Sequence, residues 1–174
     1  DGTPDIRHVR AVARRLGLIQ LDYVNVLVPA HYMVPFSRIG PYDRSKLDEL
    51  AYRRRELTEQ WAHEASLVVM ELWPLLEYRR RSHRVRPYAF ADFVESHPRY
   101  VESALEQVRE EGPLLPDALP DPPGADRVGH EWFRSVRRCV LEAHFGEGRL
   151  AVARRESNFA RVYELAERVV PARH

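Results

Sequence analysis

The stretch that decides the fold is residues 17–43, which read GLIQLDYVNVLVPAHYMVPFSRIGPYD. It begins with the alternation of a strand, because the apolar side chains share one face of an extended chain: Ile19, Leu21 and Tyr23. Gln20 and Asp22 then share the opposite face. The pattern predicts a short strand over residues 18–24 that presents an amide and a carboxylate in the same direction.

The elements around this strand can be predicted from their caps and periods. Residues 5–16 carry an apolar stripe with the period of a helix, with Asp5 as the expected N-cap and Gly17 at the end. Further signals after the strand predict helices over 30–38 and 43–53, and strands over 56–61 and 66–70 that pair as a hairpin. Helix, strand, two helices and a hairpin form the order of a winged helix.

The second half of the chain predicts the same order again. A connector helix from residue 71 to 81 leads to a helix over 97–111, a short helical segment over 114–119, a helix over 130–145, and a hairpin of 150–153 with 160–165. We therefore expect a mainly α (α+β) protein of tandem winged helix-turn-helix domains with small β-hairpin wings. The expected division is 1–70 for the first domain with the Gln-Leu-Asp motif, 71–95 for the connector helix and linker, and 96–174 for the second domain.

Composition excludes several classes of protein. The 174 residues are 44% hydrophobic and 30% charged, which is ordinary for a soluble globular protein, and no apolar run approaches the ~18 residues that span a bilayer. Cys139 is the single cysteine, so it forms no internal disulfide, and we expect a small buried residue on a helix. With no hydrophobic leader before the first helix, we expect a cytoplasmic, nucleoid-associated protein and no membrane partner.

Charge is distributed unevenly along the chain. The net charge is +1, but residues 95–126 hold eight acidic and two basic side chains, a local −6 that leaves +7 for the remainder. Of the 27 basic residues only Lys46 is a lysine. Guanidinium groups suit bidentate contact with phosphate, although this preference for arginine also fits codon bias.

Metal and nucleophile motifs are missing from the sequence. His63 and Glu64 lack a second histidine four residues on, and one cysteine excludes a thiolate site, so we expect no metal and no cofactor. Three hydroxyl or thiol groups lack the context of a catalytic nucleophile: Ser37, Ser66 and Cys139. Carboxylate chemistry and nucleic-acid binding remain.

Three segments carry a family resemblance: LGLIQLDYVNVLVPAHYMVPFSRIGPYD, RELTEQWAHEAS and GRLAVARRESNFARVYELAERVVP. They resemble the tandem winged-helix DNA glycosylases of the YcaQ/AlkX type, in the right order over most of the chain, with the weakest correspondence at 84–130. Such proteins have three winged-helix units and a C-terminal β-rich piece in roughly twice this length. The resemblance implies an N-terminal portion, with the C-terminal winged-helix and β-rich domains of the same chain missing.

The resemblance also assigns the roles of the polar pair. The family's Gln-apolar-Asp motif falls on Gln20-Leu21-Asp22, which makes Asp22 the catalytic carboxylate and Gln20 the group that helps hold the water or the lesion. A related branch has a glutamine where Asp22 stands. Asp22 therefore implies the branch that unhooks interstrand crosslinks and removes N7-alkylated purines. Without the resemblance, the two residues read as solvated polar groups.

The chemistry of such a lesion fits one carboxylate. An N7-alkylated guanine is cationic and leaves without a strong acid, so its N-glycosidic bond breaks through an oxocarbenium-like sugar. Asp22 would stabilise that charge and take a proton from the attacking water, and Gln20 would orient the water with its amide oxygen.

Basic side chains near the motif are candidates for DNA binding: Arg38, Arg53, Arg54, Arg55, His31 and His63. Runs of arginine contact phosphates in many DNA-binding proteins, but they also occur as solvated faces. The two histidines fit contact with DNA or Asp22, and equally a structural role. Both interpretations stay open at this point.

The sequence therefore predicts a monofunctional DNA repair glycosylase, a monomer that acts on double-stranded DNA with alkylated or crosslinked guanine. Two alternatives remain. A non-catalytic winged-helix transcriptional regulator would read bases with one helix. A protein-interaction module would bind DNA weakly or with little dependence on salt. In both alternatives Asp22 would tolerate substitution.

Overall fold

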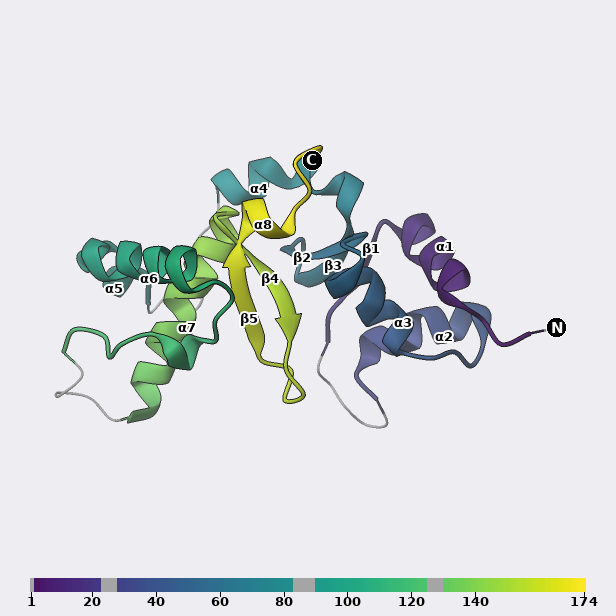
Figure 1. Cartoon of the computed structure of the whole chain (residues 1–174), viewed down its shortest axis with the longest axis horizontal. Coiled ribbons are helices and arrows are strands. Elements are labelled where there is room, and N and C mark those ends of the chain that lie inside the picture. The colour runs from purple at the N-terminus through teal and green to yellow at the C-terminus, as the bar shows by residue number, and fades with distance from the viewer. Residues whose placement is uncertain (1, 23–27, 83–89, 125–129) are drawn as a thin grey trace. The chain divides into compact units, whose positions relative to one another are not determined.

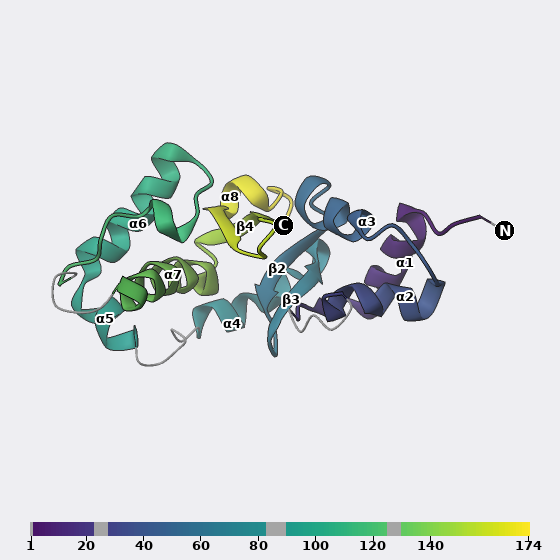
Figure 2. The same cartoon turned by 90° about the horizontal axis from the view of Figure 1, so that it is seen from below.

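The computed structural model describes residues 2–22, 28–82, 90–124 and 130–174, and the chain forms two compact units (Figures 1 and 2). The first unit is Asp1–Glu77 with Val170–His174, and the second is Tyr78–Val169. The division falls within residues 71–95, for which the sequence predicts a connector. The exact boundaries given above stay a prediction.

The first unit begins with the helix that the sequence predicts. In α1 (Ile6–Leu16) the Asp5 side chain accepts a hydrogen bond from the Arg7 backbone N–H, and Gly17 ends the helix at φ 76°. The predicted helix over 30–38 begins as a 3-10 turn, η1 (Ala30–Tyr32), and continues as α2 (Met33–Ile39). The predicted helix over 43–53 is confirmed in two parts, α3 (Ser45–Asp48) and a wider π-type turn, η2 (Glu49–Arg53).

A three-stranded antiparallel sheet follows, in the order β1-β3-β2. It consists of β1 (Leu18–Gln20), β2 (Leu57–Trp61) and β3 (Ala65–Val69), so the predicted hairpin is confirmed and β1 lies along its second strand (Figure 1). The core of the unit comes from both helices and strands: Val9, Ile19, Leu47, Leu50, Leu57 and Leu67. Short turns η3 (Met70–Leu72) and η4 (Pro74–Leu76) lead into α4 (Glu77–Arg81) where the sequence predicts the connector helix.

The second unit follows the order of elements that the sequence predicts, with a further helix before and after them. It contains α5 (Ala91–Ser96), α6 (Pro98–Glu111), η6 (Pro116–Ala118), α7 (His130–Glu147), β4 (Leu150–Arg155), β5 (Arg161–Leu165) and α8 (Ala166–Val169). The strands β4 and β5 pair antiparallel, as predicted for the second hairpin. The helix α5 was not predicted. Cys139 is buried on α7, where burial raises the pKa of its thiol to about 11.

In both units the chain passes from a helix to the sheet in the same way. Gly112 ends α6 at φ 87°, as Gly17 ends α1, and Leu114 then bridges Tyr163 of β5, as β1 pairs with β3. Helices with small antiparallel sheets establish the α+β class. The winged-helix assignment stays a prediction.

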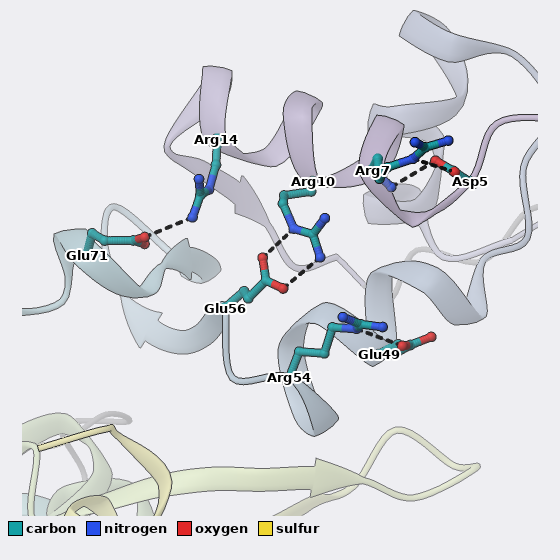
Figure 3. A network of polar contacts seen from close by, with 8 residues as sticks. All are labelled: Asp5, Arg7, Arg10, Arg14, Glu49, Arg54, Glu56 and Glu71. Carbon is teal, nitrogen blue, oxygen red and sulfur yellow. Dashed lines mark hydrogen bonds and ion pairs between the residues drawn. The ribbon is translucent and has the colours of Figure 1, made fainter. Parts of the chain in front are cut away.

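Ion pairs hold α1 against the rest of the first unit (Figure 3). Arg10 contacts Glu56 through two hydrogen bonds, from Nε to Oε2 at 2.5 Å and from Nη2 to Oε1 at 2.8 Å. Both side chains are about one quarter exposed, at 25% and 26%. Arg14 pairs with Glu71 further along the helix, but these side chains are 58% and 50% exposed. The pair of Arg10 and Glu56 is bidentate and shielded from solvent, so it is the stronger of the two ion pairs.

Replacing Glu56 tests this tie. The Arg10 guanidinium lowers the pKa of the Glu56 carboxyl below its unfolded value, so the stabilisation is present above about pH 4.3 and is lost as pH falls through the folded pKa. We expect Glu56→Gln to lower the free energy of unfolding at pH 7 by about 1–2 kcal/mol. Denaturant titration would measure it, with Glu71→Gln as the control at about 0.5 kcal/mol or less. Equal losses of stability in Glu56→Gln and Glu71→Gln would contradict the conclusion that Arg10–Glu56 is the stronger ion pair.

Gly148 is a second position where the backbone constrains the fold. It lies between α7 and β4 at φ 79°, and a Cβ atom there would overlap the side chain of Arg80, which is buried. We expect Gly148→Ala to lower the free energy of unfolding by about 2–4 kcal/mol, since left-handed backbone strain adds to the displacement of Arg80. Gly124→Ala is the control, because Gly124 has φ 84° but nothing within 4 Å of a Cβ, so it isolates the strain of about 1 kcal/mol.

Candidate functional site

The Gln-Leu-Asp motif lies at the end of β1, next to the turn of the hairpin. Gln20 is paired with Ser66 of β3, and the Leu21 backbone N–H donates to the Ala65 carbonyl at 2.8 Å. Ile19 and Leu21 are 2% and 9% exposed, whereas Gln20 is exposed. This confirms the predicted alternation up to Leu21. Asp22 is half-buried, and the predicted place of Tyr23 lies outside the described residues.

His63 contacts the amide of the motif. It lies in the turn between β2 and β3, which is closed by a hydrogen bond from the Ala62 backbone N–H to the Glu64 carbonyl at 3.0 Å. The His63 Nε2–H donates to Oε1 of Gln20 at 2.9 Å, since a carbonyl oxygen only accepts. The sequence placed both residues among the candidates but did not connect them. They are 43 positions apart, so only the hairpin brings them together.

His31 contacts the other end of the motif. Its Nδ1–H donates to the backbone carbonyl of Asp22 at 3.1 Å, and its side chain is 2% exposed. Next to it, the Tyr32 hydroxyl donates to both carboxylate oxygens of Asp48, at 2.9 and 3.1 Å. The Tyr42 hydroxyl donates to the Tyr32 carbonyl at 3.0 Å. A half-buried set of hydrogen bonds, together with the buried His31, thus anchors η1 beside Asp22.

Burial dominates the electrostatics of this network. It raises the pKa of the Asp48 carboxyl above its usual value, against the hydrogen bond from Tyr32, which lowers it. Burial, followed by the charge of Asp48, also raises the pKa of the Tyr32 hydroxyl. Tyr32 therefore stays protonated and serves as a hydrogen-bond donor to a carboxylate that water reaches poorly.

The candidate arginines lie on separate elements with different partners. Arg38 is exposed on α2 and donates from Nη1 to the Val34 carbonyl at 2.8 Å. Arg53 is exposed at the end of η2, and Arg54 pairs with Glu49 at 2.7 Å (Figure 3). Arg55 is half-buried at φ 55°. Arg38 and Arg53 are therefore better placed for an external anion than Arg54 and Arg55.

Arg38 also borders a groove between α1 and α2. The groove has a volume of about 580 Å³ and is lined by His8, Ala11, Val12, Arg15, Leu16, Arg38 and Ile39. Its lining is mainly apolar, with Arg15 and Arg38 as its charged members. Sequence analysis did not identify this groove, because its residues come from two elements more than twenty positions apart.

Metal and membrane sites are not found in the described parts of the chain. Within those ranges no three His, Cys, Asp or Glu side chains are grouped so that they could hold a metal ion. None of the helices there is long and apolar enough to cross a membrane.

Comparison with known proteins agrees with the sequence resemblance. The family described as "DNA glycosylase AlkZ-like" matches residues 13–174, which includes the Gln-Leu-Asp motif and both units. The chain belongs to the AlkZ-like DNA glycosylase family. This family acts in DNA repair, so the family assignment implies DNA as the partner and hydrolysis of an N-glycosidic bond as the type of reaction. No solved structure matches the chain.

The hydrogen bonds of Tyr32 and Tyr42 are expected to stabilise the first unit to different extents. We expect Tyr32→Phe to lower the free energy of unfolding by about 1.5–3 kcal/mol, because it removes the donor to a shielded carboxylate. Tyr42→Phe removes a donor to a neutral carbonyl, and we expect about 1 kcal/mol. Thermal or denaturant unfolding of the two variants would compare them. A smaller loss of stability for Tyr32→Phe than for Tyr42→Phe would mean that the Tyr32 hydroxyl does not hold Asp48.

Proposed function

We propose that the protein is a monofunctional DNA glycosylase that releases N7-alkylated purines or unhooks interstrand crosslinks, with Asp22 as the catalytic carboxylate. The observation that carries the proposal is the arrangement of the motif. Gln20 is held through its side chain by His63, and Asp22 through its backbone by His31. An exposed amide and a half-buried carboxylate, each in a residue that a histidine contacts, are typical of a preorganised site.

Asp22 would act on the sugar and on water. A cationic N7-alkylated guanine needs no strong acid to leave, so the developing charge lies on the oxocarbenium-like sugar. A carboxylate beside it stabilises that charge and takes a proton from the attacking water. The half-buried place of Asp22 strengthens its interaction with that charge relative to one in bulk water.

Gln20 would act as a donor, which changes the role assigned from the sequence. Its amide oxygen accepts from His63, so the amide nitrogen is the group that can face a water molecule or the lesion. An N–H donor can hold the oxygen of the attacking water while Asp22 accepts its proton. The pair then contributes complementary contacts to one water molecule.

DNA would be bound mainly through phosphate contacts. Arg38 and Arg53 are exposed, and guanidinium groups suit phosphate oxygens, whereas the exposed Arg54 is paired with Glu49. We further propose that each unit is a winged helix, with β2–β3 and β4–β5 as wings, that the protein is a monomer, and that this chain is the N-terminal portion of a longer one. The C-terminal winged-helix and β-rich domains would then complete the DNA channel.

Base excision tests the role of Asp22. We expect Asp22→Asn to lower the rate of release of N7-methylguanine, or of a crosslinked guanine, from duplex DNA by about 10² to 10⁴-fold in the full-length protein. Asp117→Asn is the matched control, because Asp117 stands five residues after Gly112 as Asp22 stands five residues after Gly17. It should leave the rate unchanged.

The other outcomes separate the alternatives. Full excision by Asp22→Asn would contradict the catalytic role of this carboxylate. No excision by the unmodified protein, with selective binding to undamaged DNA, would indicate a transcriptional regulator. Weak binding that does not depend on salt would indicate a protein-interaction module.

A further inference from the structure

We propose that His63 is a positioning residue for base excision, which acts through the amide of Gln20 and does not contact DNA. The proposal rests on the function proposed above, since it concerns the same motif. It assigns to His63 a role different from the DNA contact that the sequence suggested.

The backbone fixes both partners of this hydrogen bond. Trp61 and Ala65 are the last pair of the β2–β3 ladder, and the turn between them is closed by the bond from Ala62 to Glu64. The bond from Leu21 to Ala65 ties the end of β1 to the same turn. His63 lies between Ala62 and Glu64, and Gln20 precedes Leu21, so each residue is adjacent to one that makes these main-chain hydrogen bonds. The sheet therefore brings the two side chains within reach of each other, and Nε2 of His63 lies 2.9 Å from Oε1 of Gln20.

The hydrogen bond decides which end of the amide faces outward. A glutamine side chain can rotate so that either its oxygen or its nitrogen points to a given side. In the tautomer that carries its proton on Nε2, His63 pairs with the amide oxygen at 2.9 Å, and the amide nitrogen in that place would bring two donors together. The contact therefore couples the tautomer of His63 to the orientation of the Gln20 amide. His63 therefore orients Oε1 toward the turn and turns the N–H donors of Gln20 away from it. A net hydrogen bond of this kind favours one orientation by about three- to tenfold.

The same bond opposes a direct role of His63 on DNA. Nε2 is occupied by Gln20, so a phosphate that took this N–H would release the amide. A residue that positions Gln20 changes the rate of excision, whereas a residue that binds phosphate changes the affinity for DNA. The two roles therefore have separate measurements.

The first experiment is single-turnover excision of N7-methylguanine by the full-length protein, with the dissociation constant for the same duplex measured separately. We expect His63→Ala to lower the excision rate constant about three- to tenfold and to leave the dissociation constant unchanged. His63→Gln can present either an N–H donor or an oxygen to Gln20, so it should recover only part of the rate. Glu64→Ala, in the same turn, is the control, because only the backbone carbonyl of Glu64 accepts hydrogen bonds there.

A double-mutant cycle with Gln20 tests the route of the effect. In a Gln20→Ala background, His63→Ala should cause no further loss, because the group through which it acts is gone. A full additional loss there, or a weaker affinity for DNA at an unchanged rate constant, would overturn the proposal. The Asp22→Asn arm separates the two hypotheses. If Asp22→Asn abolishes excision but His63→Ala leaves the excision rate constant unchanged, only the proposed role of His63 is wrong. If Asp22→Asn excises at the normal rate, both the proposed function and the role of His63 are wrong.

Discussion

The pairing of β1 with β3 is the constraint on which the candidate site depends. This strand has three residues, yet main-chain bonds extend the ladder at both ends, from Val69 to Gly17 and from Leu21 to Ala65. A slip of one residue would exchange the faces, bury Gln20 and expose Leu21. Burial of Ile19 and Leu21 opposes that slip, since apolar side chains gain about 25 cal/mol for each Å² removed from water. The fold thus fixes the direction of Gln20, the last residue of β1.

Part of this arrangement could be predicted from the sequence because it depends on local signals. The Asp5 cap, the Gly17 end and the apolar stripe of α1 are all encoded within a few residues, and so is the alternation around Gln20. The contact of His63 with Gln20 depends instead on the register of β1 against the hairpin, which neither segment encodes alone. The short helix α5 and the π geometry of η2 were also not predicted, because their sequences show no capping or periodic signal that distinguishes them.

The second unit has the same succession of backbone features as the first, but it lacks the Gln-Leu-Asp motif. A positive-φ glycine, a segment that pairs with the last strand and a carboxylate five residues after the glycine are all present there, as Gly112, Leu114 and Asp117. Leu115 stands where the first unit has Gln20. Without the amide, a histidine in the turn would have no side chain to orient. Under the proposed mechanism, the site thus depends on a few polar residues added to a chain path that occurs in both units.

The two histidines differ in what they fix, and burial explains the difference. His31 is almost fully buried and contacts a backbone carbonyl, so it resists displacement of the chain at Asp22. His63 is exposed and contacts a side chain, so it can restrain an orientation without a large contribution to stability. In the mechanism proposed above, Asp22 as the catalytic carboxylate needs a fixed place, because charge stabilisation falls with distance. An amide that holds water needs a fixed polarity but must remain accessible. Placing one partner inside the unit and the other at its surface satisfies both requirements.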